Sequence, residues 1–334
     1  MNPPPSGGNR PRKASGPRAR LSPTARAIRA GDRRVLARLI SDVEAREPAT
    51  RSILEELYPY TGRIPVIGIS GPLGVGKSSL VNLLIQHLRG RGKKVGVIAV
   101  DPTSPFSGGA VLGDRIRIQR PAEDTGVFLR SMASRGHSGG VSQSTREVIR
   151  LLEAFGMDVV LVETVGSGQV DVEIHEIAST RVVVLVPHLG DDVQTMKAGL
   201  FEIADVFAVN KADLPGADEA AHHLMELIRT APAGESWHPR IMKTSAQIPL
   251  GIPELWEAVE AHESYLREGV PGEQARQRRL RQELRDLVTG RFAGELEDAM
   301  DRDPALDRLF QKVAEGTLDP YRAADRVYES LRKR

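Results

Sequence analysis

Cysteine is absent from this sequence of 334 residues, which excludes disulfides, thiolate metal sites, iron–sulfur clusters and thiol nucleophiles. The sequence also lacks an apolar run of about 18 residues, the length that could cross a bilayer, and it has no apolar segment typical of a secretory signal. The mean hydropathy is −0.27, and 40% of the residues are hydrophobic, which is enough for a substantial core. These features predict a globular cytoplasmic protein without a membrane segment.

A large excess of charge of one sign is also missing, since 46 basic residues stand against 44 acidic ones. Residues 1–20 hold five of the basic residues and no acid, so the rest of the chain is slightly acidic. A general nucleic-acid-binding function therefore loses its main support. The same segment contains five prolines and no amphipathic period. We expect residues 1–23 to form a disordered basic tail.

The length predicts about two units, or one large α/β domain with appendages. Residues 24–60 have a helical pattern, in which Gly31 ends one helix and Asp32 caps the next. Residues 61–271 then alternate helical stretches with short β-branched runs, which begin at Ile64, Val95, Val127, Asp158, Arg181 and Asp205. Strands that are apolar on both faces indicate a mostly parallel sheet covered by helices on both sides. Ligands of such sheets bind at the carboxyl ends of the strands.

Residues 272–334 are rich in arginine and glutamate and have a helical period. Apolar stripes follow this period at Leu280, Leu284 and Leu287, at Leu306, Leu309, Phe310 and Val313, and at Ala324, Val327, Tyr328 and Leu331. Asp319 and Pro320 are a suitable N-cap and first residue for the last helix. Such a helical extension could pack on its own domain or serve as an oligomerisation arm, and a stripe alone does not identify its partner.

Residues Gly71–Ser79, GPLGVGKSS, follow a predicted strand and open a predicted helix, as a phosphate-binding P-loop requires. The glycines of such a loop let backbone N–H groups turn toward the phosphates, and the helix N-terminus adds its partial positive charge. Lys77 is expected to reach the β- and γ-phosphates, and Ser78 to ligate Mg²⁺. The candidate nucleotide-binding residues here are Gly71, Gly74, Val75, Gly76, Lys77, Ser78 and Ser79.

Guanine selection is predicted by the segment NKAD, in which Asn210, Lys211 and Asp213 end a strand. An aspartate at this place can accept hydrogen bonds from both N1–H and the exocyclic amine of guanine, a pairing that adenine cannot satisfy. The tripeptide Thr244–Ser245–Ala246 follows another short apolar run. We expect Ser245 and Ala246 to lie in the loop behind the base.

Three acids at predicted strand ends or in loops could complete a Mg²⁺ site with Ser78, namely Asp101, Asp114 and Glu163. Asp101 and Asp114 could instead cap turns. Glu163 precedes a glycine loop, which is usual for the metal and water side of a nucleotide site. In that loop, Gly166 is expected to sense the γ-phosphate and Gln169 to lie near the attacking water. The predicted catalytic residues are therefore Lys77, Glu163 and Gln169.

With these residues in view, the chain resembles the MeaB/ArgK family of GTPases over about residues 24–334. The resemblance rests on GPLGVGKSS, VDPTSPFSGGAVLGDRIRI, FLRSMASRGHSGGVS, VETVGSGQVDVEI and VPHLGDDVQTMKAGLFEIADVFAVNKAD, together with the TSA loop. It implies a P-loop GTPase fold with an N-terminal helical segment and a C-terminal helical dimerisation arm at 272–334. It also implies GTP and GDP as substrate and product, Mg²⁺ as cofactor, and a chaperone role toward a cobalamin-dependent acyl-CoA mutase of the methylmalonyl-CoA mutase type.

The sequence departs from the family pattern at two places. Ser79 follows Ser78 where the family commonly has threonine, and His188 follows Pro187 where the family usually has glycine. Arg135 and His188 are candidates for transmitting the nucleotide state to the mutase. Two other functions remain open, a P-loop small-molecule kinase and a nickel-delivery GTPase, although NKAD disfavours the first and the absence of cysteine the second.

Overall fold

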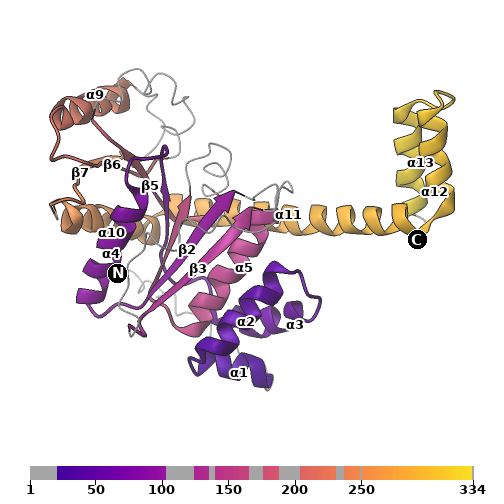
Figure 1. Cartoon of the computed structure of the whole chain (residues 1–334), viewed down its shortest axis with the longest axis horizontal. Coiled ribbons are helices and arrows are strands. Elements are labelled where there is room, and N and C mark those ends of the chain that lie inside the picture. Colours follow the sequence, from indigo (N-terminus) through magenta and orange to yellow (C-terminus); the bar gives the residue numbers. More distant parts are fainter. Residues whose placement is uncertain are drawn as a thin grey trace, which may run out of the picture.

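The computed structural model describes residues 21–102, 124–134, 140–164, 176–187, 204–230, 237–248 and 250–332. Its centre is a sheet of seven strands that pair in parallel in the order β3-β2-β4-β1-β5-β6-β7 (Figure 1). The strands are β1 (Val66–Ser70), β2 (Val95–Pro102), β3 (Val127–Ser134), β4 (Val159–Thr164), β5 (Thr180–Leu185), β6 (Val206–Val209) and β7 (Arg240–Lys243). All six predicted strands are present, and the expectation of a parallel sheet is confirmed.

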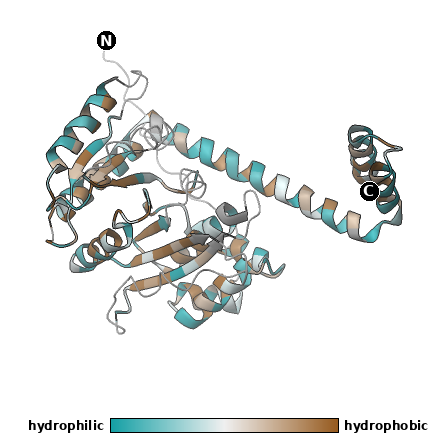
Figure 2. Ribbon diagram, turned by 45° about the horizontal axis from the view of Figure 1, so that its top comes forward, coloured by the Kyte–Doolittle hydropathy of each residue, from teal (hydrophilic) through white to brown (hydrophobic). Residues whose placement is uncertain are grey.

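Helices cover both faces of the sheet, because successive strand residues point to opposite sides. One face packs against α4 (Lys77–Gly90) and α10 (Ile252–Glu268), and the other against α5 (Gly140–Phe155) and α9 (Ala217–Thr230). Figure 2 shows the apolar strands enclosed between helices whose outer faces are polar. No helix in the described part of the chain is long and apolar enough to cross a membrane.

The N-terminal helices α1 (Pro23–Arg29), α2 (Arg33–Glu44) and α3 (Thr50–Leu57), with the 3-10 turn η1 (Tyr58–Tyr60), form a third layer over α5. Asp32 caps α2 through hydrogen bonds from the backbone N–H groups of Arg34 and Val35, as the sequence predicts. The carboxylate of Glu153 on α5 accepts hydrogen bonds from three successive backbone N–H groups at residues 62–64. This contact fixes the connection between the helical layer and β1.

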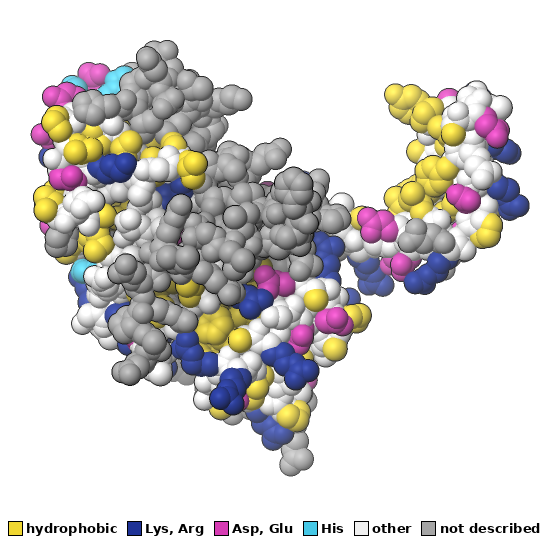
Figure 3. Space-filling view, in the orientation of Figure 1, with side chains coloured by type: hydrophobic (Ala, Val, Ile, Leu, Met, Phe, Trp, Pro, Cys, Tyr) yellow, Lys and Arg dark blue, Asp and Glu magenta, His cyan; other side chains and the backbone are white. Residues whose placement is uncertain are grey.

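The C-terminal residues form α11 (Val270–Arg302), α12 (Pro304–Ala314) and α13 (Pro320–Arg332). At 33 residues, α11 is about 50 Å long, and in Figure 1 it leaves the body and carries α12 and α13 at its far end. Asp319 caps α13 as predicted, with a hydrogen bond from the Arg322 N–H. Ala323, and not the predicted Ala324, is the buried alanine of that helix. Figure 3 shows hydrophobic side chains gathered on the α12–α13 hairpin.

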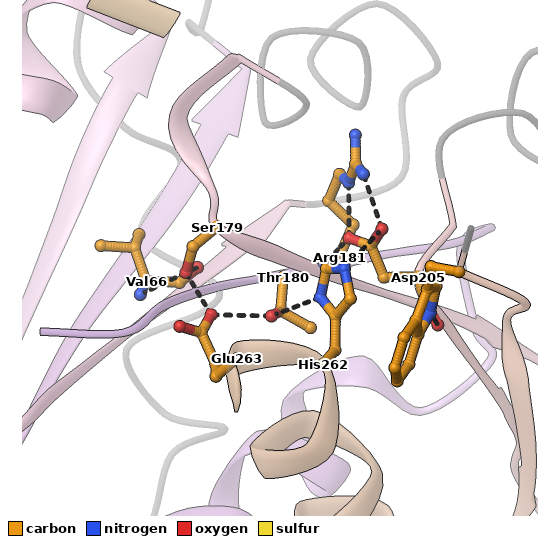
Figure 4. Close-up of polar contacts among 8 residues, drawn as sticks. Val66, Ser179, Thr180, Arg181, Asp205, His262 and Glu263 are labelled. Atoms are coloured by element: carbon orange, nitrogen blue, oxygen red, sulfur yellow. Dashed lines mark hydrogen bonds and ion pairs between the residues drawn. The ribbon is translucent and has the colours of Figure 1, made fainter. Parts of the chain in front are cut away.

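A buried polar cluster joins α10 to the amino ends of β5 and β6 (Figure 4). Arg181 donates two side-chain hydrogen bonds to the carboxylate of Asp205, at 2.6 and 2.7 Å. Thr180 Oγ1 donates to Glu263 at 2.7 Å and lies 2.9 Å from His262 Nδ1. These contacts hold the last turns of α10 against the amino ends of β5 and β6.

His262 is buried within this cluster, and the ring of Trp237 packs against it with centroids 4.7 Å apart. Trp237 Nε1 donates to the backbone carbonyl of Asp205 at 3.0 Å. Burial lowers the pKa of His262, and this effect outweighs the opposing attraction of Asp205 and Glu263. Burial therefore disfavours the charged imidazolium relative to a histidine in water.

Candidate functional site

The P-loop joins the carboxyl end of β1 to the first turn of α4, and two of its glycines are sterically required. Gly71 has a φ of +142°, and a Cβ atom there would lie 2.2 Å from the carbonyl oxygen of Val184. Gly76 has a φ of +94°, and a Cβ atom there would lie 2.5 Å from Nδ2 of Asn210. The loop therefore packs against the ends of β5 and β6 too closely for any other residue at these two positions.

Lys77 is the first residue of α4, and its side chain turns back over the loop. Its Nζ donates hydrogen bonds to the carbonyl oxygens of Gly71 and Pro72, at 2.7 and 2.8 Å. Only 6% of the residue is exposed. A buried ammonium requires partners, and these carbonyls help to hold the charge at the mouth of the P-loop.

Ser78 and Glu163 meet at this edge of the sheet, although they are 85 residues apart in the chain. Ser78 Oγ donates to Glu163 Oε1 at 2.6 Å, and Glu163 is 7% exposed near the end of β4. A hydroxyl and a carboxylate are the hard oxygen donors that Mg²⁺ prefers, so this pair fits such an ion. The described residues contain no group of three or more His, Asp or Glu side chains that could hold a metal by themselves. A cation here would need further oxygen ligands from phosphate or water.

Asn210 and Lys211 connect the end of β6 to the P-loop. Asn210 Nδ2 donates to the carbonyl oxygen of Val75 at 2.7 Å, and Lys211 Nζ donates to that of Gly74 at 2.9 Å. Lys211 has a φ of +57°, which is uncommon for a residue with a side chain. Two adjacent side chains therefore join the segment predicted to select the base to the loop predicted to hold the phosphates.

Asp213 and Ser245, two residues that the sequence predicts around the base, contact each other. Ser245 Oγ donates to Asp213 Oδ1 and accepts from the N–H of Gln247 at 3.2 Å. Ala246 follows, partly buried, in the turn that the sequence predicts. The backbone N–H of Ala212 donates to the carbonyl of Thr244 at 2.9 Å, which fixes the two segments side by side.

The structure describes only some of the other predicted site residues. Ser79 is exposed on the first turn of α4. The backbone of Asp101 lies at the carboxyl end of β2, two residues beyond Ala99, which pairs with Glu163. The predicted residues Asp114, Gly166, Gln169, Arg135 and His188 lie outside the described residues.

Thr244 belongs to the predicted TSA loop, but the sequence does not indicate what its own side chain does. It is fully buried, and its Oγ1 donates to Asn210 Oδ1 at 3.3 Å. Its backbone N–H donates to Val209 at 2.9 Å, so it continues the pairing of β6 with β7. Its position directly before Ser245 was the available signal, but the tripeptide does not reveal a contact with a residue 34 positions earlier.

A parallel sheet with a P-loop at one strand end and an NKAD segment at another defines the class of P-loop GTPases. The model of the family described as methylmalonyl Co-A mutase-associated GTPase MeaB matches residues 36–301, and the chain belongs to this family. The resemblance that the sequence motifs indicate is thereby confirmed.

Individual relatives agree with this assignment over most of their length. The chain is 45% identical over 307 residues to a protein of Pyrococcus abyssi, covering 91% of this chain and 94% of that one. It is 34% identical over 310 residues to the GTPase ArgK of Escherichia coli, covering 90% and 94%. A crystal structure described as an LAO/AO transport system kinase is similar with a TM-score of 0.68 and 29% identity, covering 93% of this chain and 97% of that one.

Proposed function

We propose that this protein binds GTP at the P-loop, hydrolyses it to GDP and phosphate, and uses the two nucleotide states to control a cobalamin-dependent acyl-CoA mutase. The observation that carries the nucleotide part is the pair Asp213–Ser245, joined through Asn210 and Lys211 to the phosphate loop. It combines a carboxylate suited to guanine with a loop suited to phosphates in one continuous site.

The residues of the site have distinct roles in this proposal. The P-loop backbone and Lys77 hold the β- and γ-phosphates, and the ammonium stabilises charge that develops during transfer of the γ-phosphoryl group. Asp213 accepts two hydrogen bonds from guanine, with Ser245 fixing the orientation of its carboxylate. Glu163 and Gln169 are assigned to the side where water attacks, and Gly166 to contact with the γ-phosphate.

Magnesium is the cofactor that this donor chemistry supports. Ser78 and Glu163 would hold it, directly or through water, with Asp101 and Asp114 as further candidates. When bound, the ion neutralises charge on the phosphate oxygens. Because Ser78 is also the first-turn residue next to Lys77, the hydroxyl and the ammonium would approach the same phosphates from one helix end.

The mutase partner is supported by the family to which the chain belongs, whose description names methylmalonyl Co-A mutase. We infer that the GTP and GDP states differ in loops near the site, and that this difference gates cobalamin loading or protection of the mutase. No arginine occurs between Glu163 and Gln169, so intrinsic hydrolysis is expected to be slow and the mutase to accelerate it.

A homodimer built through residues 272–334 is also part of the proposal. The arm carries several large apolar side chains that are mostly exposed in the single chain, including Leu284, Phe292, Tyr321 and Tyr328. Solvent-exposed apolar surface of this kind is typical of an interaction site. A second copy of the chain, contributing the same surface, would cover it symmetrically.

The test of nucleotide binding is calorimetric titration with GTP, GDP and ATP, followed by turnover assays with and without Mg²⁺. GTP and GDP should bind far more tightly than ATP, and Lys77→Ala should lower turnover at least about a hundredfold. Lys93→Ala removes an exposed lysine beyond α4 and is the matched control, expected to retain wild-type turnover. Equal affinities for GTP and ATP, or unchanged turnover in Lys77→Ala, would contradict the proposal.

The test of the partner is GTP turnover with and without a cobalamin-dependent acyl-CoA mutase, together with mutase binding in the GTP and GDP states. Acceleration and nucleotide-dependent binding are expected. Phosphoryl transfer to a small molecule would favour the kinase alternative instead, and nickel binding would favour the metal-delivery alternative.

A further inference from the structure

Helix α11 lies along α5 before it leaves the body, and two ion pairs join the helices. Arg150 pairs with Glu283, and Arg146 Nη1 donates to Asp286 Oδ2 at 2.7 Å. Further along, a Cβ atom at Gly290 would lie 3.7 Å from the side-chain oxygen of Gln143. As residue numbers on α11 rise, those of their partners on α5 fall, so the two helices run antiparallel.

The direction of this packing brings the arm to the nucleotide edge of the sheet. Helix α5 begins at Gly140, with only five residues between it and Ser134 at the end of β3, so its first turns lie near the carboxyl ends of the strands. Because α11 follows α5 toward those first turns, it leaves the body on that side. In Figure 1 it departs from the body on the side toward which the arrowheads of β2 and β3 point.

Arg146 has a second acidic partner that belongs to neither helix. Its Nη2 donates to Glu176 Oε2 at 3.1 Å, while Nη1 is held by Asp286. Glu176 follows Glu163 of β4 by 13 residues in the chain. It is the first described residue after 165–175. One guanidinium therefore binds both Glu176, which lies between β4 and β5 in the chain, and the helix that carries the arm.

Burial makes the double contact of Arg146 energetically important. The side chain of Arg146 is 9% exposed, against 18% for Asp286 and 37% for Glu176. A guanidinium removed from water needs its charge compensated and its N–H groups paired, and its planar fork can bind two carboxylates in fixed directions. Movement of either acid changes the preferred position of the arginine and, through it, of the other acid.

We propose that Arg146 is a positioning residue that links the nucleotide state of the site to the direction of the arm, through Glu176 on one side and Asp286 on the other. This inference rests on the proposed function, because it requires that the position of Glu176 differs between the GTP and GDP states. The link is in series, so breaking either contact should uncouple the arm from the nucleotide. By reciprocity, the arm should also alter the relative affinities for GTP and GDP.

The absence of cysteine allows a direct measurement in the full chain. Single cysteines replacing the exposed residues Gln86 on α4 and Arg326 on α13 accept spin labels, and the distance between them reports the direction of the arm. Labelled protein is diluted with unlabelled protein so that only distances within one chain contribute. Spectra are recorded with GDP and with a non-hydrolysable GTP analogue, and the affinity for each nucleotide is measured by calorimetry.

The variants separate the proposed link from general packing of the two helices. Glu176→Gln and Asp286→Asn should each abolish the difference between the GDP and GTP-analogue distances, and the double variant should match the single ones. Each should also shift the ratio of GTP to GDP affinity about fivefold or more. Glu283→Gln is the matched control, since it breaks the Arg150 pair between the same helices and leaves both contacts of Arg146 intact; it should retain the difference.

Two results would overturn the inference while leaving the proposed function in place. One is a wild-type protein that binds both nucleotides with the same arm distance in each state. The other is an equal loss of the difference in Glu283→Gln and Asp286→Asn, or no effect of Glu176→Gln. A wild-type protein that binds no guanine nucleotide would refute the proposed function itself, and with it this link.

Discussion

Asn210 joins the P-loop to the NKAD and TSA segments through hydrogen bonds of its side chain. The residue is 1% exposed, and its amide donates to the Val75 carbonyl and accepts from the Thr244 hydroxyl. Asn210→Ala leaves both partners buried without a hydrogen bond, at about 1–3 kcal/mol each. The Thr244 contact is long at 3.3 Å, so it belongs at the low end of that range. We expect the free energy of unfolding to fall by about 2–4 kcal/mol.

The measurement is thermal and urea unfolding in the absence of nucleotide, so that stability is separated from binding. At roughly 2–4 °C per kcal/mol for a domain of this size, the melting temperature should fall by roughly 4–16 °C. Asn82→Ala is the matched control, because the side-chain carbonyl of Asn82 on α4 has no hydrogen-bond partner among the described residues. It should change the stability by less than about 0.5 kcal/mol.

Gly76 supplies a second, independent check on the same contact. A Cβ atom at Gly76 would lie 2.5 Å from Asn210 Nδ2, so Gly76→Ala should be less harmful in the Asn210→Ala background, where that atom is gone. The positive φ of Gly76 remains unfavourable in both backgrounds. The double variant should thus be more stable than the sum of the single effects by about 1 kcal/mol or more. Additive effects, or an Asn210→Ala variant as stable as Asn82→Ala, would refute the reasoning.

Three further predictions concern base choice, pH and assembly. Asp213→Asn should shift preference from guanine to xanthine nucleotides, measured by calorimetry, and an unchanged preference would contradict the role of the carboxylate. Because the pKa of His262 is lowered in the folded protein, the unfolded state binds more protons as the pH falls below about 6.5, so the free energy of unfolding should decrease there. His262→Gln should reduce this pH dependence in urea unfolding, and identical pH profiles of the two proteins would contradict the role of His262. Deletion of residues 272–334 should convert a dimer into a monomer by light scattering while nucleotide binding stays measurable. A monomeric full-length chain at micromolar concentration would reject the arm as an interface.

The sheet and most of the candidate site were predictable from the sequence because their signals are local. Most of the strands are short runs rich in β-branched residues, and the P-loop and NKAD segments have fixed spacings imposed by backbone geometry. Gly71 illustrates this, since the approach of the Val184 carbonyl to within 2.2 Å of a Cβ position permits only glycine. Where a backbone contact permits only one residue type, a sequence motif is enough to predict the local structure.

The contacts that join distant elements were not predictable in this way. Neither the Arg146 contacts nor the approach of Thr244 to Asn210 follows from a periodicity, because each depends on how separate elements pack. The arm is an intermediate case. Its helices and the Asp319 cap could be predicted from the sequence. The direction in which α11 leaves the body is fixed by ion pairs between α5 and α11, whose partners are 133 and 140 residues apart in the chain.

Polar clusters lie at both the carboxyl and the amino ends of the strands, and only the first could be predicted from the sequence. At the carboxyl edge, buried Lys77 and Asn210 are held by backbone carbonyls of the P-loop, so their partners are present whatever side chains surround them. At the amino edge, Arg181 and Asp205 satisfy each other, and the pairing holds only if β5, β6 and α10 are already in place. Such a network costs stability when any member is lost, because the remaining charge is buried without a partner. The phosphate loop therefore depends on backbone geometry that the sequence encodes locally. The cluster at the amino ends of the strands, like the pairs Ser78–Glu163 and Asp213–Ser245 of the site, depends on side chains that only the folded chain brings together.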